Sequence, residues 1–443
     1  MKLLLFFLLV GLAQATPPNI ILCMTDDQGW GDTGYNGHPV LRTPHLDQMA
    51  REGLRFDRFY SSSPVCSPTR GSCLTGRYPE RYGIHYANVG HLKKEEITLA
   101  EVLREKGYAT GHFGKWHLGT LTTKMKDANR GRIGHTENYS GPWANGFDEC
   151  FATESKVPTY WKQGDYESYG TRYWTGPEQM VPAGEIQGDD SVLIMDRALS
   201  FIKKSAEKKI PFFAVIWFHA PHLPVVSAPP FTDGYTENKD YYGCITALDS
   251  QMGRLRAELG KLGQDQNTML WFCSDNGPEG KADKAPGTAK NLRGRKRSLY
   301  EGGVRVPGLL VWPEKITEAR TTSLPCVTSD YFPTILEVLG HTLPDHQARP
   351  YDGVSLLPLI DGKMKERPRP IAFQARKQVS LIDNRYKLIR SNPKSSFELY
   401  DLIQDEGEQA NIAFKHPEVV SKMKATLAEW QKSCRESNAG KDY

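Results

Sequence analysis

The chain has 443 residues, with 56 Lys and Arg residues against 52 Asp and Glu, a formal net charge of +4 and eight cysteines. This near-neutral charge argues against a nucleic-acid partner, and eight cysteines are too few to hold a fold of this length together by disulfides. No apolar run is long enough to cross a membrane as a helix, so we expect no integral membrane segment.

The first fifteen residues have the parts of a secretory signal peptide. Lys2 supplies a positive start, residues 3–12 form a short apolar core, and residues 13–15 have the small-residue cleavage sequence A-Q-A. We predict cleavage after Ala15 and export of the remaining chain. In a bacterium this means secretion or the periplasm, and in an animal it means the lysosome or the exterior.

Residues 19–24 form a continuous apolar run, which predicts a strand buried on both faces. Asp26 and Asp27 follow almost at once. Adjacent carboxylates repel each other unless something positive lies between them. Two neighbouring Asp residues also occur in ordinary solvated turns, but their place at the end of a buried strand favours a metal site.

A second strand-like segment, residues 54–60, leads into a turn at Cys66 that opens a helix. We expect Ser67 to cap this helix, Pro68 to lie in its first turn and Gly76 to end it. Cys66 would then lie beside the positive end of the helix dipole, with Arg70 one turn away, which favours an anion. A cysteine in such a place is also commonly an ordinary buried apolar residue.

Strands and helices alternate through the next 270 or so residues, which predicts a mostly parallel α/β sheet with helices on both faces. The further predicted strands are 108–113, 212–218, 268–274 and 308–311, and the predicted helices are 44–53, 98–107, 190–204, 241–262 and 330–339. Ligands bind such sheets beyond the carboxyl ends of the strands. The polar residues just after predicted strands, which we therefore expect to share one site, are Asp26, Asp27, Lys115, His222, Asp275 and Asn276.

The pattern changes after about residue 365. Short strand-like segments at 371–375, 378–382, 386–390 and 398–401 precede a helix that begins near Pro417. We predict a small C-terminal antiparallel sheet with one helix. The predicted organisation is therefore a signal peptide over 1–15, a main domain over 16–365 and a C-terminal α+β subdomain over 366–443.

Three features allow more than one interpretation. Residues 121–188 are expected to form long loops, whose aromatic residues could stack on sugars or simply pack. These residues are Trp143, Tyr160, Trp161, Tyr173 and Trp174. The basic run 291–297 could meet an acidic substrate or be a solvated loop. The pairing of the cysteines other than Cys66, Cys23 and Cys273 stays open.

Nearly the whole mature chain resembles the formylglycine-dependent (type I) sulfatase family, in both the order and the spacing of its motifs. The matched motifs are D-D-Q-G-W-G-D, C-S-P-T-R, G-K-W-H-L-G, A-P-H-L-P, S-D-N-G and Y-E-G-G-V-R-V-P. Within the family, the N-acetylgalactosamine-6-sulfatase and arylsulfatase group is nearest. Cys73 departs from the signature, which usually has a larger apolar residue there. The resemblance implies an alkaline-phosphatase-like fold, with residues 16–365 as the sulfatase catalytic domain.

The resemblance also implies the cofactors. A maturation enzyme would oxidise Cys66 to Cα-formylglycine, whose hydrate attacks the sulfur of the ester. One calcium ion is implied, for which magnesium is the ordinary substitute, since oxygen ligands suit a hard cation. The ligands carried over from the family are Asp26, Asp27, Asp275, Asn276 and the modified Cys66.

The remaining catalytic roles follow position by position from the same resemblance. Arg70 and Lys115 match the residues that hold the hydrate and the sulfate. His117 is similar to the histidine that takes a proton from the hydrate as sulfate leaves. His222 and Lys296 look like the pair that holds the ester oxygen and protonates the leaving alcohol.

The motif A-P-H selects His222 as the catalytic histidine, although His219 lies only three residues earlier. The implied function is a secreted sulfuric ester hydrolase that releases inorganic sulfate from a sulfated carbohydrate. One alternative is a phosphonate or phosphate ester hydrolase of the same superfamily, against which C-S-P-T-R argues. The other is a non-catalytic binder of sulfated glycans, which would require an unmodified Cys66 or a missing ligand.

Overall fold

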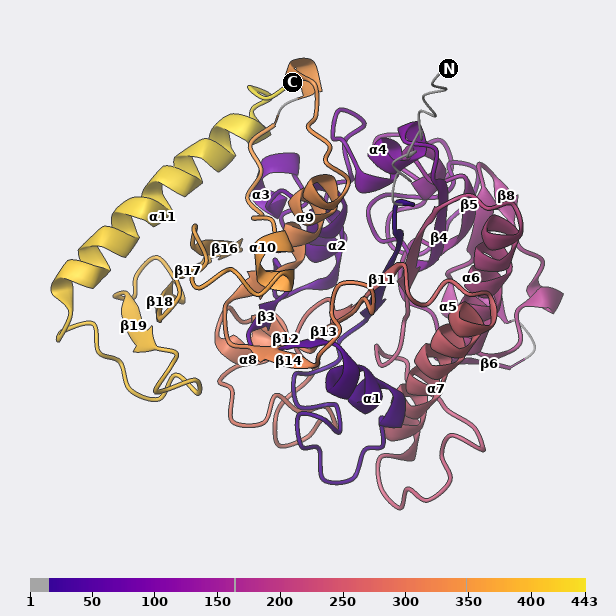
Figure 1. The fold of residues 1–443 in the computed structure, drawn as a ribbon, viewed down its shortest axis with the longest axis horizontal. Coiled ribbons are helices and arrows are strands. Elements are labelled where there is room, and N and C mark those ends of the chain that lie inside the picture. The colour runs from indigo at the N-terminus through magenta and orange to yellow at the C-terminus, as the bar shows by residue number, and fades with distance from the viewer. Residues whose placement is uncertain (1–15, 163–164, 348) are drawn as a thin grey trace, which may run out of the picture.

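The computed structural model describes residues 16–162, 165–347 and 349–443, so the predicted signal peptide lies outside the described residues. A ten-stranded sheet runs through the molecule (Figure 1) in the order β14-β2-β13-β11-β1-β10-β4-β5-β7-β8. Its strands are β1 Asn19–Thr25, β2 Leu54–Phe56, β4 Ala109–Lys115, β5 Glu149–Thr153, β7 Tyr173–Gly176, β8 Gln179–Met180, β10 Phe212–Trp217, β11 Thr268–Ser274, β13 Gly308–Val311 and β14 Arg320–Thr322.

The centre of this sheet is parallel. Strand β1 pairs in parallel with β10 and β11, and β4 pairs in parallel with β10 and β5. Antiparallel pairs occur toward both edges, where β13 joins β11 to β2 and β7 joins β5 to β8. The predicted fold class, an alkaline-phosphatase-like mixed and mostly parallel sheet flanked by helices, is confirmed.

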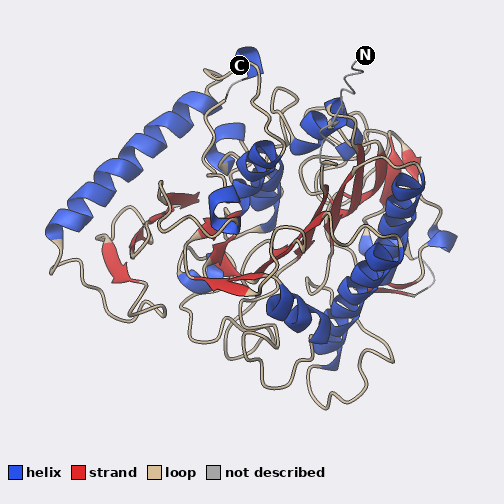
Figure 2. Cartoon of the chain, viewed as in Figure 1, coloured by secondary structure: helices blue, strands red, loops and turns tan. Residues whose placement is uncertain are grey.

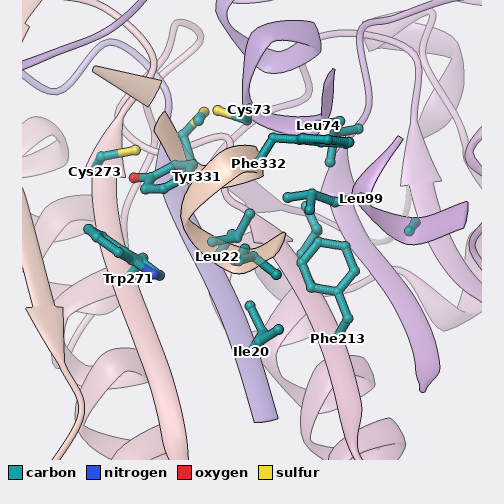
Figure 3. Packing of buried hydrophobic residues seen from close by; sticks show 14 of the residues in the cluster. Ile20, Leu22, Cys73, Leu74, Leu99, Phe213, Trp271, Cys273, Tyr331 and Phe332 are labelled. Atoms are coloured by element: carbon teal, nitrogen blue, oxygen red, sulfur yellow. The ribbon is translucent and has the colours of Figure 1, made fainter. Parts of the chain in front are cut away.

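Helices cover both faces of the sheet (Figure 2) because each central strand is apolar on both sides. They are α1 Pro44–Glu52, α2 Cys66–Thr75, α4 Leu99–Glu105, α6 Asp190–Glu207, α7 Lys239–Lys261 and α9 Tyr331–Val338. Ile20 and Leu22 of β1 pack with α2, α4 and α9 (Figure 3), whereas Ile21 and Cys23 pack with α1, α6 and α7. Burying each such side chain contributes roughly 1.5–3 kcal/mol.

The C-terminal unit has the predicted form. Strands β16 Ile371–Ala375, β17 Gln378–Ile382, β18 Tyr386–Arg390 and β19 Glu398–Asp401 form an antiparallel sheet in sequence order. Helix α11, Pro417–Asn438, packs Met423 and Leu427 into the same apolar cluster as Leu381 and Leu388. The four strand ranges agree with the sequence. The domain boundary near residue 365 stays a prediction.

Several local expectations are wrong. Helix α2 begins at Cys66 after Val65 and has no side-chain cap, so Ser67 lies inside the helix rather than capping it. The segment 54–60 is two strands, β2 and β3 Phe59–Tyr60, which belong to different sheets. Residues 121–188 contain β5, β7 and β8, which extend the main sheet, because short buried strands lack a clear period.

The remaining elements are short. They are α3 Pro79–Tyr82, α5 Tyr166–Tyr169, α8 Glu301–Val304, α10 Leu357–Ile360, β6 Tyr160–Trp161, β9 Gly188–Asp189, β12 Arg305–Val306 and β15 Cys326–Val327, with 3-10 turns at Pro142–Ala144, Ala183–Glu185, Thr328–Asp330 and Asp345–Gln347. All eight cysteines are free and buried. Cys73 lies near Cys273 and Tyr331 (Figure 3). Within the described ranges, no helix has both the length and the apolar character needed to cross a membrane.

Candidate active site

Two neighbouring strands deliver the acidic residues to one place. Thr25 and Ser274, the last residues of β1 and β11, are paired in the parallel register. Asp26 and Asp27 therefore emerge beside Asp275 and Asn276, and the backbone N–H of Asp27 donates to Asp275 Oδ1 over 3.1 Å. Asp27 has a left-handed φ of 67°, which turns its side chain away from the strand direction.

The arrangement of these acidic residues fits a hard cation. Asp26, Asp27 and Asp275 are buried, and each offers a carboxylate oxygen within 4.8 Å of the others. Two buried oxygens, Asp26 Oδ1 and Asn276 Oδ1, accept no hydrogen bond from the residues that the structure describes. Burial and the neighbouring Asp26 raise the pKa of Asp275 to about 7. A divalent cation would relieve this repulsion and use the free oxygens, so the donor set fits calcium or magnesium.

Cys66 is the first residue of α2 and only 3% of it is exposed. Arg70, one turn further on, is fully buried, and its Nη2 lies 2.6 Å from Asp275 Oδ2 while its Nη1 donates to the Lys115 carbonyl over 3.1 Å. Burial raises the pKa of the Cys66 thiol although Lys115 and Lys296 oppose that effect. The unmodified residue is therefore a thiol at neutral pH and not a thiolate nucleophile.

Strand β4 places a cation and a histidine beside the acidic cluster. Lys115, its last residue, lies with Nζ 2.5 Å from Asp26 Oδ2. His117 follows with a left-handed φ of 58°, and its Nε2 lies 2.6 Å from Asn88 Oδ1. Burial and the charge of Lys115 hold the pKa of His117 well below its usual value. His117 is therefore neutral, and its buried Nδ1 has no hydrogen-bond partner in the described part of the chain.

His222 and Lys296 approach the cluster from the other side. His222 Nε2 lies 3.7 Å from Asp27 Oδ2, and Lys296 Nζ donates to the same carboxylate over 2.7 Å. Burial lowers the pKa of His222 despite the nearby carboxylates. Burial would also lower the pKa of Lys296, but Asp27 outweighs it and holds that pKa well above its usual value. Lys296 is therefore a cation and His222 a neutral imidazole.

His219 has a different place. It is fully buried, with Nδ1 2.7 Å from Asp190 Oδ2 and Nε2 2.7 Å from Thr153 Oγ1. Both ring nitrogens are thus used to join β5 to α6. The geometry favours His222 as the histidine of the site, as the motif predicted.

The structure brings the predicted site residues together at the carboxyl ends of β1, β4, β10 and β11. They are Asp26, Asp27, Cys66, Arg70, Lys115, His117, His222, Asp275, Asn276 and Lys296. Their catalytic and metal-binding roles stay predictions.

The arginines of the basic run 291–297 bind other residues of the protein. Arg293 donates to Tyr400 Oη, Arg295 donates to the Glu279 carbonyl, and Arg297 pairs with both carboxylate oxygens of Glu279 over 2.6 and 2.9 Å. The run is therefore neither a free substrate-binding patch nor a simple solvated loop. Three of the aromatic residues from the 121–188 region, Trp161, Tyr173 and Trp174, are buried and pack in the core.

Sequence reasoning missed two residues beside the site. Asn88 binds His117, and Glu279 Oε2 lies 3.4 Å from Lys296 Nζ. A cavity of about 300 Å³ adjoins Glu279 and is also lined by Asp27 and Leu223. Only the position of Glu279 just after S-D-N-G gave any signal in the sequence, since Asn88 has no motif around it.

Comparison with known proteins agrees with this geometry. The model of the sulfatase family matches residues 18–341, and a model described as N-sulphoglucosamine sulphohydrolase, C-terminal, matches residues 294–433. The chain is 33% identical to N-acetylgalactosamine-6-sulfatase of Canis lupus familiaris over 396 residues, which cover 83% of this chain and 71% of that protein. It is 34% identical to arylsulfatase A of Homo sapiens over 383 residues, which cover 84% of this chain and 73% of that protein.

A solved structure is similar over almost the whole chain. The crystal structure of Ps i-CgsB in complex with k-i-k-neocarrahexaose has a TM-score of 0.83 and 26% identity, over 95% of this chain and 94% of that one. The alkaline-phosphatase-like fold, with carboxylates, an arginine and two lysines gathered in one site, is that of a hydrolase of anionic esters. Within that class the chain belongs to the sulfatase family, and it is a sulfuric ester hydrolase.

Proposed function

We propose that the protein is an exported sulfatase, dependent on formylglycine and calcium, that releases inorganic sulfate from a sulfated carbohydrate. The observation that carries this proposal is the set of charges gathered around one buried cysteine. Three carboxylates, Arg70, Lys115 and Lys296 surround Cys66, and a neutral histidine lies within the same site. Such a site is suited to an anion whose oxygens gain charge as an ester bond breaks.

Two groups that would complete the site fit its residues. Formylglycine made from Cys66 would supply the hydroxyl that attacks sulfur, and calcium held by Asp26, Asp27, Asp275 and Asn276 would withdraw charge from the sulfate oxygens. A formylglycine-generating maturation enzyme is thus a proposed partner. Export, to the exterior or periplasm or to an animal lysosome, rests on the predicted signal peptide.

The chain's own side chains supply the remaining steps. Arg70 and Lys115 are rigidly held by Asp275 and Asp26, so they can hold the sulfate group without moving. The alcohol oxygen takes a proton as its bond to sulfur breaks. The charged Lys296, with His222 beside it, is placed to give that proton.

His117 accepts a proton, whereas Lys296 donates one. Because it is neutral and its Nδ1 has no partner among the described residues, it can accept a proton when the site is restored after sulfate has formed. The neutral form of this histidine and the charged form of Lys296 coexist at neutral pH. One site thus holds both an acid and a base.

The carbohydrate part of the proposal rests on the names of similar proteins. The relatives include an N-acetylgalactosamine-6-sulfatase, and the similar solved structure holds a neocarrahexaose. The cavity beside Asp27 and Glu279 has room for part of a sugar next to the sulfate position.

The proposal is tested on protein made in a host that has the maturation enzyme. Peptide mass over Cys66 should be lower by about 18 Da, because the thiol becomes an aldehyde. The same material should turn over the aryl ester methylumbelliferyl sulfate, and Cys66→Ala should not. An unshifted mass together with binding of sulfated glycans would instead favour the binding protein, and faster turnover of the matching aryl phosphate would favour the phosphate ester hydrolase.

A further inference from the structure

The turn between β16 and β17 carries two basic residues in an unusual conformation. Ala375 pairs with Gln378, so Arg376 and Lys377 alone form the turn. Arg376 has a left-handed φ of 53°. Two-residue hairpin turns that need a positive φ at the first position normally have glycine there, because a side chain is strained in that conformation. Residues in this conformation are enriched at active sites and ligand-binding segments.

Contacts on two sides fix this turn beside the active site. The side chain of Gln378 donates to the Arg297 carbonyl over 2.7 Å and accepts from the backbone N–H of Leu299 over 3.0 Å. It thus holds the backbone that directly follows Lys296. On the other side, the guanidinium of Arg376 lies 4.0 Å from the centre of the Tyr86 ring, two residues before Asn88.

The charges of the turn are not neutralised by the protein. Arg376 and Lys377 are exposed, and neither has an ion-pair partner within the described residues. The arginines of the neighbouring basic run differ, since Arg293 and Arg297 are paired with Glu398 and Glu279. A guanidinium that lies over an aromatic ring can still donate its N–H groups to a sulfate or carboxylate.

We propose that Arg376 and Lys377 form a subsite for a second anionic group, a sulfate or a carboxylate, on the glycan whose sulfate ester enters at Cys66. This inference rests on the proposed function and extends it, because it requires a substrate with more than one negative charge. A binding role for the guanidinium would explain why an arginine occupies a position whose backbone conformation favours glycine.

The test is the substitution Arg376→Gly, which removes the guanidinium and suits the left-handed backbone. We expect turnover of methylumbelliferyl sulfate, which has one charge, to change by less than about twofold. Inhibition of that turnover by dextran sulfate should weaken by about fivefold or more, since a charge-assisted hydrogen bond is lost. The thermal midpoint should stay the same or rise, because strain is relieved.

Lys209→Gly is the matched control. Lys209 is also exposed, also has a left-handed φ of 56°, and lies just before the amino end of β10, whereas the site lies at the carboxyl ends of the strands. It should leave inhibition by dextran sulfate unchanged. Equal inhibition of the wild type and Arg376→Gly would overturn the inference, as would an equal loss in Lys209→Gly or no inhibition of the wild type.

Direct binding separates this inference from the proposed function. The anisotropy of fluorescent dextran sulfate measures binding to the same proteins whether or not they turn over the aryl ester. A protein without turnover whose binding still weakens in Arg376→Gly would reject the proposed catalysis and keep the anion subsite. Full turnover of the aryl ester, together with dextran sulfate binding that Arg376→Gly leaves unchanged, would keep the proposed catalysis and reject the anion subsite.

Discussion

At the scale of single residues, Asn88 determines which nitrogen of His117 can act as a base. Its Oδ1 lies 2.6 Å from His117 Nε2 and also accepts a hydrogen bond from Asn129 over 2.9 Å. An amide oxygen can only accept, so Nε2 carries the hydrogen and Nδ1 carries the lone pair. The other charged groups that act on His117 are Lys115, Arg130, Arg70 and Asp26.

Asn88→Asp should therefore change the pH profile. A carboxylate facing Nε2–H stabilises the charged imidazole and raises the pKa of His117, and activity that needs neutral His117 is lost as pH falls through that pKa. The acid limb of kcat/KM for methylumbelliferyl sulfate should move to higher pH by about one unit. Asp tolerates the left-handed φ of 64° at this position, and Asn88→Gly, which also does, removes the acceptor without adding charge. An acid limb shared by all three proteins would contradict the assignment.

The burial of Glu80 makes the stability of the fold depend on pH. Burial, followed by the charge of Asp352, raises its pKa to about 8 from an ordinary 4.5. Between these two values the folded chain keeps a proton that the unfolded chain has lost. The contribution of protonated Glu80 to the free energy of unfolding is thus fully present below about pH 4.5 and is lost as pH rises through about 8.

Glu80→Gln should remove this loss because the amide never ionises. In urea unfolding, the wild type and the variant should have similar stability at about pH 5, and the variant should be more stable at about pH 9. The neighbouring Glu95→Gln serves as a control at an exposed position. Parallel stability curves for wild type and Glu80→Gln would show that Glu80 is ionised in the folded protein.

At the scale of elements, a buried ion cluster joins the C-terminal sheet to the main domain. Lys387 of β18 lies 2.9 Å from Glu301 of α8 and 3.0 Å from Glu408, and all three are buried. Tyr60 Oη, from β3, donates to Glu301 over 2.9 Å. Residues 297–305 directly follow Lys296, so this cluster also supports the loop that carries that lysine.

Lys387→Met should destabilise the protein by about 3–5 kcal/mol, since it leaves two carboxylates buried without their cation. Urea unfolding measures this loss, and Lys394→Met, at an exposed position of the same sheet's last turn, should have little effect. The double variant with Glu408→Gln should recover part of the stability. A loss below about 1 kcal/mol would mean that water reaches the cluster.

Some elements and contacts could be predicted from the sequence and others could not, and the difference has a physical reason. The strands of the C-terminal sheet and the central strands were found because their apolar runs end at turns that local residues define, and the acidic residues after β1 and β11 follow from strand ends. The contacts of Asn88 and Gln378 could not be found, because their partners lie far along the chain. Strand β5 was missed because its five residues show no period.

At the scale of the whole molecule, metal binding should stabilise the fold. The proposed ligand residues directly follow β1 and β11, which are central strands of the sheet, so unfolding would destroy the cation site. Calcium at about 100 times its dissociation constant should add about 2.7 kcal/mol. Removing it with a chelator should lower the thermal midpoint of the protein.

Scanning calorimetry with calcium and with chelator measures this difference. Asp27→Asn should lose most of the calcium-dependent shift, because one of the charges that attract the cation is removed. Asp361→Asn, at an exposed carboxylate, should keep it. A midpoint that does not depend on calcium in the wild type would contradict a resident cation at this site.

The burial of Cys66 also limits the time during which an enzyme could modify this residue. Strand β11, Asp275 and Lys296, which help to enclose this cysteine, are made more than 200 residues after it. At ordinary rates of elongation the ribosome needs about 10–40 s to add that length of chain. The proposed maturation enzyme would have to oxidise Cys66 in this interval, or on chains that have not yet folded. Under the proposed maturation, the yield of active protein depends on whether Cys66 is oxidised before the chain folds around it, so slower translation between residues 66 and 275 should raise that yield.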